Sequence, residues 1–206
     1  MNAERDNQDE EPEHVEANFS HGMFADVIWQ SRRFVTCRFV GANFQEAVLT
    51  ECFFEDCDFS GAQFNAATLT QCNFTNCRFV SANFFVARVL QCRLLGADFT
   101  EAALGGVTIT GCDLSFANFR HQVLKKFDFR DQKLEGTDFH AADLTKANLS
   151  GADLSGANLT GANLTHADLR GAILDRIDCR AIQLSETKLD ISQAIYFARC
   201  YGATVS

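Results

Sequence analysis

Cysteine is the residue type in this sequence with the widest range of chemistry, because thiolates bind metals, act as nucleophiles and form disulfides. The chain has nine cysteines among 206 residues. A zinc site needs thiolates that converge on one point in a tetrahedral arrangement. Seven of the nine instead recur at intervals that are multiples of five: Cys37, Cys52, Cys57, Cys72, Cys77, Cys92 and Cys112. This spacing predicts a repeated structural position and not a metal site.

Histidine and glycine motifs give no catalytic site either. Four histidines (His21, His121, His140 and His166) fall on positions expected to face water, His14 lies in an acidic stretch, and none has a partner at ligand spacing. Glycines at 151, 156, 161 and 171 follow a five-residue interval and do not form a phosphate-binding G-x-x-x-x-G-K loop. We therefore expect no catalytic residue, no metal and no cofactor.

The elements that carry these residues follow a repeat of five. From 138 to 172 every fifth residue is Phe or Leu, and the register extends without insertion from Phe19 to Leu189. All 35 central positions are apolar, the least regular being Trp29, Val89, Ile109 and Cys179. This period fits neither a helix at 3.6 nor a strand at 2, so it indicates an internal repeat.

A second column lies two residues before each central position and is mostly Ala, Gly or Cys, beginning at Ala17 and Gly22. A large and a small side chain that both point inward in every repeat predict a narrow core that is filled layer by layer. The seven cysteines occupy this small column. Neighbouring cysteines stacked along the rod would lie about 4.8 Å apart with their side chains pointing the same way, which does not suit a disulfide. We therefore expect them to be reduced, Ala-sized side chains.

The pattern resembles the pentapeptide-repeat family, whose motif is A(D/N)LXX, over residues 17–189. The resemblance implies an all-β fold, a right-handed quadrilateral β-helix in which four pentapeptides make one square coil and residues 20 apart stack. Stacked coils share a core that one repeat cannot bury alone. About nine coils at roughly 4.8 Å per rung predict a rod on the order of 40 Å long.

Domain boundaries follow from composition. Residues 1–16 hold seven acids, one Arg and the single Pro, which predicts a disordered acidic tail carrying −6 of the net charge of −9. Residues 17–189 are the expected β-helix. The 20 Phe residues are explained as core, with one ladder through Phe19, Phe39, Phe59, Phe79, Phe99, Phe119 and Phe139. Without a secretory signal or an apolar run near 18 residues, we expect a cytoplasmic protein with no membrane contact.

Two stretches depart from the repeat. Arg32 occupies a small-column position, where its charge must snorkel or pair. From 118 to 137, Gln122, Phe127 and Gln132 successively take positions that favour Ala, so the backbone must swell or kink there. Basic residues gather in the same segment, beginning with Arg120. They are interleaved with acids, which favours a mixed surface over a phosphate-binding patch, and we expect no direct nucleic-acid binding.

Residues 190–206 predict a closing helix. Asp190 followed by Gln193 resembles a capping box, apolar residues then recur at helical spacing, and Gly202 stops the turn. The ending LDISQAIYFARCYGATVS and the segment ITGCDLSFANF resemble the Qnr and MfpA proteins of this family. The resemblance implies a homodimer through the C-terminal end, with these residues at the contact: Ile191, Ala194, Ile195, Ala198, Tyr201 and Val205.

The same resemblance implies a function. Qnr and MfpA proteins bind DNA gyrase or topoisomerase IV as mimics of the DNA duplex and protect the enzyme from fluoroquinolones. On this chain the candidate gyrase-facing acidic stripe is the outward position of one face: Asp98, Asn118, Asp138, Asn158 and Asp178. Carboxylates every two rungs, about 10 Å apart, are far sparser than the charges of DNA, one per about 1.7 Å.

Three alternatives stay open at this stage. The Asp/Asn stripe equally fits a turn preference of the fold. Arg120, Gln122, Phe127 and Gln132 are candidates for contact with a partner. The chain could also be a non-enzymatic interaction module for another regulatory partner, or protect against a different topoisomerase poison.

Overall fold

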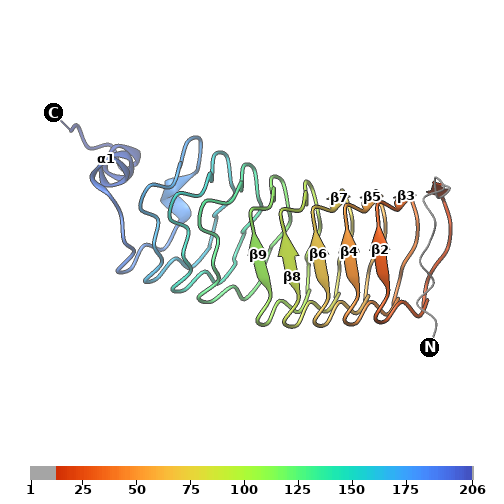
Figure 1. The fold of residues 1–206 in the computed structure, drawn as a ribbon. Helices are drawn as coiled ribbons and strands as arrows, with labels where there is room; N and C mark the ends of the chain where they lie inside the picture. The colour runs from red at the N-terminus through yellow and green to blue at the C-terminus, as the bar shows by residue number, and fades with distance from the viewer. Residues whose placement is uncertain (1–12, 206) are drawn as a thin grey trace.

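The computed structural model describes residues 13–205 as a rod of stacked square coils, a right-handed quadrilateral β-helix. The N-terminal coil lies at one end of the rod and a short helix at the other (Figure 1). This confirms the expected fold class. The expected acidic tail falls mainly on residues 1–12, which lie outside the described residues.

Two parallel sheets form along the first half of the rod. One contains β1 (His14–Val15), β3 (Arg33–Val35), β5 (Phe53–Glu55) and β7 (Asn73–Thr75). The other contains β2 (Ile28–Gln30), β4 (Val48–Thr50), β6 (Thr68–Thr70), β8 (Arg88–Leu90) and β9 (Thr108–Thr110). Each strand pairs with the strand 20 residues further on, for example Trp29 with Leu49, so four pentapeptides complete one coil.

The 20-residue register continues outside the named strands as isolated bridges, from Asn18 with Arg38 to Asp168 with Lys188. A typical backbone hydrogen bond joins Phe39 N to Asp58 O at 2.7 Å. Between pentapeptides the chain turns a corner at a residue in the left-handed region, such as Glu46 with φ 57°. The backbone thus satisfies most of its polar groups between coils, and within a coil through turns such as Ala42 N to Phe39 O at 3.0 Å.

Phenylalanine rings fill the core in columns. Phe39 and Phe59 stack at 4.8 Å, and Phe99 and Phe119 at 4.9 Å. The whole expected ladder from Phe19 to Phe139 is stacked in this way. Rings of neighbouring faces meet edge to face, as Phe54 and Phe59 do at 5.3 Å, which is a favourable aromatic geometry.

The seven small-column cysteines are buried and free, as expected. Their thiols point along the rod and donate to backbone carbonyls of the preceding coil. Cys57 Sγ, for example, lies 3.6 Å from Phe34 O. Burial raises the pKa of the Cys77 thiol well above its ordinary value, because the charged form loses its hydration. These side chains therefore act as small core residues.

The rod begins earlier than the predicted boundary at residue 17. His14 and Val15 form β1 and pair with Phe34 and Val35. The His14 imidazole stacks on the Phe34 ring at 5.1 Å, so histidine takes the central position one repeat before Phe19. The assignment of His14 to the tail was wrong because its ring is flat enough to continue an aromatic column. Arg32 lies with its guanidinium 4.9 Å from the centre of the Trp29 ring.

The C-terminal end is closed by α1 (Ile191–Cys200). Asp190 accepts a hydrogen bond from Gln193 N, and the Gln193 side chain accepts one from Asp190 N, so the predicted capping box is present. The helix covers the last coil with Gln193 and Phe197, which are buried. Gln193 Nε2 donates to Leu169 O and to Ala172 O, two carbonyls at the end of the ladder.

A disulfide between Cys179 and Cys200 joins this helix to the last coil, with the Cα atoms 6.3 Å apart. Cys179 belongs to η1 (Cys179–Ala181), a 3-10 turn that replaces the regular pentapeptide. Nothing in the five-residue repeat indicates this bridge. The two cysteines are 21 residues apart in sequence, and only the fold of α1 back onto the coil brings them together.

Because the rings are stacked, removing one of them should lower the free energy of unfolding by a large amount. Phe59→Ala leaves a cavity between Phe39 and Phe79, and we expect a loss of about 3–5 kcal/mol in unfolding free energy. Phe116→Ala is the matched control, because that ring is 60% exposed, and should change stability by less than about 0.5 kcal/mol. Denaturant unfolding followed by Trp29 fluorescence measures both, and equal effects would contradict the stacked core.

The cap of α1 predicts a dependence on pH. Hydrogen bonds from the Ser192 side chain and from Gln193 N lower the pKa of Asp190 to about 2. Since the ordinary value in unfolded chains is about 3.9, the cap is complete above about pH 4 and is lost as the pH falls toward 2. Hydrogen exchange of the α1 amides should therefore accelerate in this window relative to intrinsic rates. Asp190→Asn keeps the acceptor without titrating, so its α1 should show no such transition.

Candidate functional site

The predicted acidic stripe is largely straight. Asp98, Asn118, Asp138 and Asn158 pair in succession as bridges on one face of the rod. Asn118 Nδ2 donates to Asp98 Oδ1 at 2.9 Å, and Asn158 Nδ2 donates to Asp138 Oδ1 at 3.0 Å. Alternating Asp and Asn therefore avoid stacking like charges, because the Asn118 amide stands between the carboxylates of Asp98 and Asp138.

These side chains also hold the turns of the chain. The Oδ1 atom of every stripe residue accepts a hydrogen bond from the backbone N–H two residues later, as Asp98 does from Thr100 N at 3.0 Å. This is an Asx turn, which explains why Asp and Asn recur at this position. Arg120 Nη1 lies 2.9 Å from Asp138 Oδ2 and offsets part of the negative charge. The stripe thus has a structural role whether or not it meets a partner.

Asp178 does not continue the stripe. Among the described residues no bridge pairs it with Asn158, and its side chain caps the 3-10 turn by accepting from Arg180 N at 3.1 Å. The prediction that it extends the stripe was wrong, because the chain leaves the square coil at this corner to meet α1.

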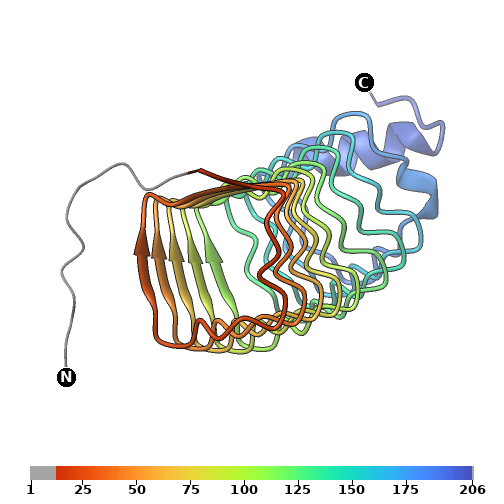
Figure 2. The same ribbon diagram turned by 90° about the vertical axis from the view of Figure 1, so that its right-hand side faces the viewer.

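The main departure from the regular rod is an interruption of the backbone ladder. Within the described residues, no backbone hydrogen bond joins residues 101–111 to residues 121–131. The ladder is intact on either side: Phe84 N bonds Ala103 O at 2.8 Å, and Leu124 N bonds Asp143 O at 2.8 Å. A step after β9 is visible along the rod (Figure 1), and the later coils are displaced sideways when the rod is viewed along its axis (Figure 2).

Oversized side chains in the small column cause the interruption. Gln122 is buried, and its Nε2 atom donates to Phe99 O at 2.6 Å and to Ala102 O at 3.1 Å, so the side chain stands where Val123 N would otherwise approach Ala102 O. The Phe127 ring stacks on Phe129 at 4.4 Å and lies below Val107 in the same column. The predicted swelling of the segment 118–137 therefore takes the form of two coils held apart.

Two further polar residues close the core beyond the interruption. Gln132 Oε1 accepts from Cys112 N at 2.9 Å, and its Nε2 donates to Ile109 O at 3.4 Å. Thr137 Oγ1 donates to Leu114 O at 2.9 Å. The oversized column thus satisfies carbonyls that a thiol or the backbone serves in other coils, so it is polar without leaving buried groups unpaired.

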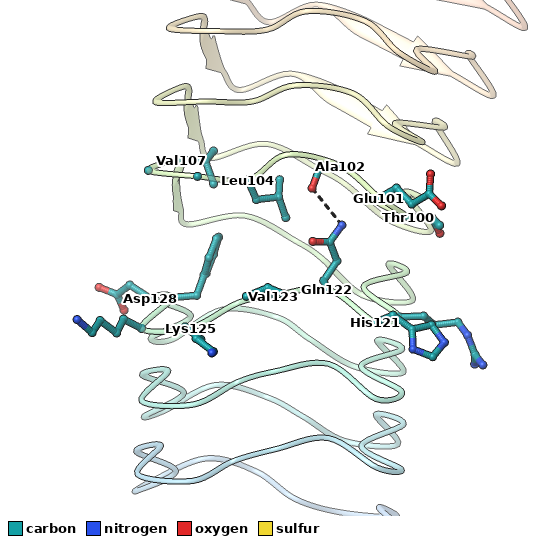
Figure 3. A pocket seen from close by; sticks show the side chains of 15 residues that line it. Thr100, Glu101, Ala102, Leu104, Val107, His121, Gln122, Val123, Lys125 and Asp128 are labelled. Atoms are coloured by element: carbon teal, nitrogen blue, oxygen red, sulfur yellow. Dashed lines mark hydrogen bonds between the residues drawn. The ribbon is translucent and has the colours of Figure 1, made fainter.

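A cavity of about 800 Å³, which we call the mid-rod cleft, opens between the separated coils. Its upper edge is residues 100–107 and its lower edge is residues 120–128. Figure 3 shows Gln122 reaching from the lower edge to the Ala102 carbonyl, with Lys125 and Asp128 at one end of the cleft and His121 at the other. An unbroken repeat in the sequence therefore does not guarantee an unbroken ladder in the structure.

The cleft exposes the core slightly and carries mixed charge. Leu104 is 9% exposed, against 2% for Phe84 and 1% for Leu124 in the coils above and below. Lys125 Nζ lies 3.2 Å from Asp143 Oδ2. Hydrogen bonds from the Arg130 side chain hold the pKa of Asp128 below its ordinary value. The mixed surface expected for this segment is therefore present.

The exposed face of α1 holds the predicted dimer residues. Ile191 is 81% exposed and Tyr201 65%; Ala194 and Val205 are exposed, and Ile195 and Ala198 are half-buried. The opposite face packs on the last coil through Gln193 and Phe197. The structure thus leaves the predicted residues accessible and has no partner chain against them.

Metal and membrane contacts can be assessed over residues 13–205. No group of three or more His, Cys, Asp or Glu side chains in this range could hold a metal ion. Within the same range, no helix has the length and apolarity to cross a membrane. The lack of a catalytic role stays a prediction.

The chain belongs to the pentapeptide-repeat family. The family profile, described as pentapeptide repeats, matches residues 37–76, 77–115, 112–151 and 137–176. No curated protein matches the sequence.

Solved structures give more specific similarities. Full-length QnrB1, described as a plasmid-mediated fluoroquinolone resistance protein, is 26% identical over 93% of this chain and 100% of its own, with a TM-score of 0.79. A trypsin-treated variant of QnrB1 is 28% identical over 94% and 97%, with a TM-score of 0.65. HetL, involved in heterocyst differentiation regulation in the cyanobacterium Nostoc, is 27% identical over 85% and 84%, with a TM-score of 0.46.

Because Gln122 and Phe127 hold the two coils apart, replacing both with alanine should close the interruption. In Gln122→Ala/Phe127→Ala the small column regains the size that it has in neighbouring coils, and we expect Leu104 and Val123 to pair. Their amides should then exchange at least about tenfold more slowly than in the unmodified protein, which corresponds to about 1.4 kcal/mol of added protection. Asp153→Asn, on another face, is the control. Unchanged exchange in the double variant would show that other residues hold the coils apart.

Proposed function

We propose that this protein binds DNA gyrase or topoisomerase IV as a mimic of duplex DNA and modulates the enzyme or protects it from fluoroquinolones. One observation carries the proposal: the chain matches the full length of QnrB1, a fluoroquinolone resistance protein, with a TM-score of 0.79.

Shape is the first physical support. A two-fold dimer through the exposed face of α1 would join two rods end to end, into a particle of about 80–100 Å by rung counting. A straight rod of this length resembles a duplex segment more than it resembles an ordinary globular domain. The dimer would cover Ile191, which is 81% exposed, and would complete the burial of the half-buried Ile195.

Charge is the second and weaker support. Asp98 and Asp138 present carboxylates on one face, and the chain carries a net charge of −9. Arg120 neutralises part of this face, so imitation of DNA would rest on rod shape and overall sign more than on charge density. Contacts from Arg120 and from the mid-rod cleft region are compatible with the same partner.

The experiment is a supercoiling titration of purified gyrase, with and without ciprofloxacin. We expect micromolar protein to inhibit supercoiling, to restore activity in the presence of drug, or to do both. Absence of either effect would remove the gyrase proposal. Restoration with another topoisomerase poison but not with ciprofloxacin would instead favour protection against that other poison.

Two variants test the surfaces in the same assay. Ile195→Asp should give a monomer by light scattering and lose the effect, because a carboxylate would be buried at the dimer contact. Asp98→Asn/Asp138→Asn keeps the Oδ1 acceptors of the turns and removes the two carboxylate charges together with the Arg120–Asp138 ion pair. A weaker effect with unchanged stability would support contact of the partner with the stripe. Asp153→Asn is the matched control, since its Oδ1 makes the same turn contact on a different face.

A further inference from the structure

At the mid-rod cleft, as at the C-terminal end of the rod, carbonyl groups of one coil bond a glutamine side chain and not the backbone of a next coil. Gln122 Nε2 donates to the carbonyls of Phe99 and Ala102, one central and one small-column residue of the coil above. At the true end of the ladder, Gln193 Nε2 donates to Leu169 and Ala172, which hold the same two positions. A buried glutamine side chain thus bonds the free carbonyls both at the cleft and at the C-terminal end of the rod. Helix α1 covers the terminal end, while no described segment covers the cleft.

Two strand-like edges face each other across the cleft without pairing. Residues 101–111 and 121–131 each keep their hydrogen bonds on the far side and lack backbone bonds toward each other. Unpaired strand edges are templates for another extended chain, and peptides commonly bind by adding a strand to such an edge. Here an added strand would have partners on both sides, so the backbone geometry favours an extended polypeptide.

The side chains around the cleft indicate the character of that polypeptide. Along the upper edge, residues 102–107 carry no charge. The lower edge carries Arg120, Lys125 and Lys126, and Lys126 has no ion pair among the described residues. Of the two cleft carboxylates, Asp128 is paired with Arg130, and Glu101 accepts from Ser81 Oγ at 3.0 Å at the far end. The lining thus carries three bases and two acids, a formal net charge of +1. Arg120 and Lys125 are paired in turn with Asp138 and Asp143, which leaves Lys126 as the basic group open to a ligand.

Apolar surface is available at the same place. Val123 on the lower edge is 69% exposed, and Val107 and Phe127 are half-buried at the back of the cleft. A strand that alternates apolar and acidic side chains would set the first against Val107 and Phe127 and the second outward, near Lys126. About 800 Å³ is within the usual range for a ligand site, and a strand of about six residues spans about 20 Å.

We propose that the mid-rod cleft binds an extended acidic segment of a partner protein by strand addition between the two separated coils. This inference does not rest on the gyrase proposal, although Arg120 lies at the edge of the cleft and also pairs with Asp138 of the acidic stripe. The added strand would restore the missing rung of the ladder.

The test uses the full chain and a fluorescein-labelled peptide of eight residues that alternates glutamate and valine. We expect saturable binding by fluorescence anisotropy with a Kd below about 1 mM. Hydrogen exchange at Leu104, Gly106 and Val123 should slow by about tenfold or more in the complex, while amides in β4 stay unchanged. A peptide that alternates lysine and valine should bind at least about tenfold more weakly.

Matched variants separate the cleft from general electrostatics. Lys126→Glu should weaken binding about tenfold, whereas Lys146→Glu, at the same position one coil further on, should not. The Gln122→Ala/Phe127→Ala variant should lose binding together with the cleft. No binding at about 1 mM, equal effects of the two lysine variants, or binding without slower exchange at the cleft amides would each overturn the proposal.

The chain itself is the competing occupant. Residues 1–12 are acidic and could supply such a segment. If the cleft amides are already slow in the free protein and become fast in Asp9→Asn/Glu10→Gln/Glu11→Gln, the cleft binds the N-terminal segment and the proposal of a partner protein is overturned. Because this assay contains no topoisomerase, its failure leaves the supercoiling result unaffected, and the reverse also holds.

Discussion

The size of the small inward column controls whether adjacent coils can pair. Where this column holds Ala or Cys, the backbone of each coil approaches the next closely enough for hydrogen bonds near 2.9 Å, and the Phe or Leu column stacks behind it. The two columns are coupled, since the same rung spacing of about 4.8 Å suits both a hydrogen-bonded ladder and stacked aromatic rings. The rod satisfies both along most of the repeat.

The interruption shows what happens when one column changes and the other does not. Leu124 and Phe129 keep the central positions filled, so the core continues across the cleft. Gln122 and Phe127 enlarge the small column, and the backbone of residues 101–111 can no longer reach the next coil. The rod tolerates this because Gln122 supplies donors to carbonyls that would otherwise lie unpaired, and because the two remaining faces stay hydrogen-bonded. A repeat protein can thus acquire a cleft without any insertion in its sequence.

The cross-section of the core is covered in a different way at each end of the rod. At the N-terminal end His14 adds one more flat ring to the aromatic column above Phe34. At the C-terminal end α1 lies across the last coil, fixed by Phe197, by the Gln193 hydrogen bonds and by the Cys179–Cys200 disulfide. Such caps prevent the edge-to-edge association to which an open solenoid is prone. The apolar residues left on the outside of α1 are consequently available for a specific contact.

The sequence by itself determined the two inward columns, the free small-column cysteines and the capped helix, because these follow from the five-residue pattern and from the capping residues. Its resemblance to the pentapeptide-repeat family implied the square coil, the 20-residue register and the Phe ladder. The sequence also located the irregular segment around Gln122 and Phe127. Only the tertiary structure decided that this segment separates two coils, that Asp178 leaves the stripe, that His14 joins the core and that Cys179 meets Cys200. These outcomes depend on how non-identical neighbours fit, on hydrogen-bond reach and on where the helix folds back, and no periodicity encodes them.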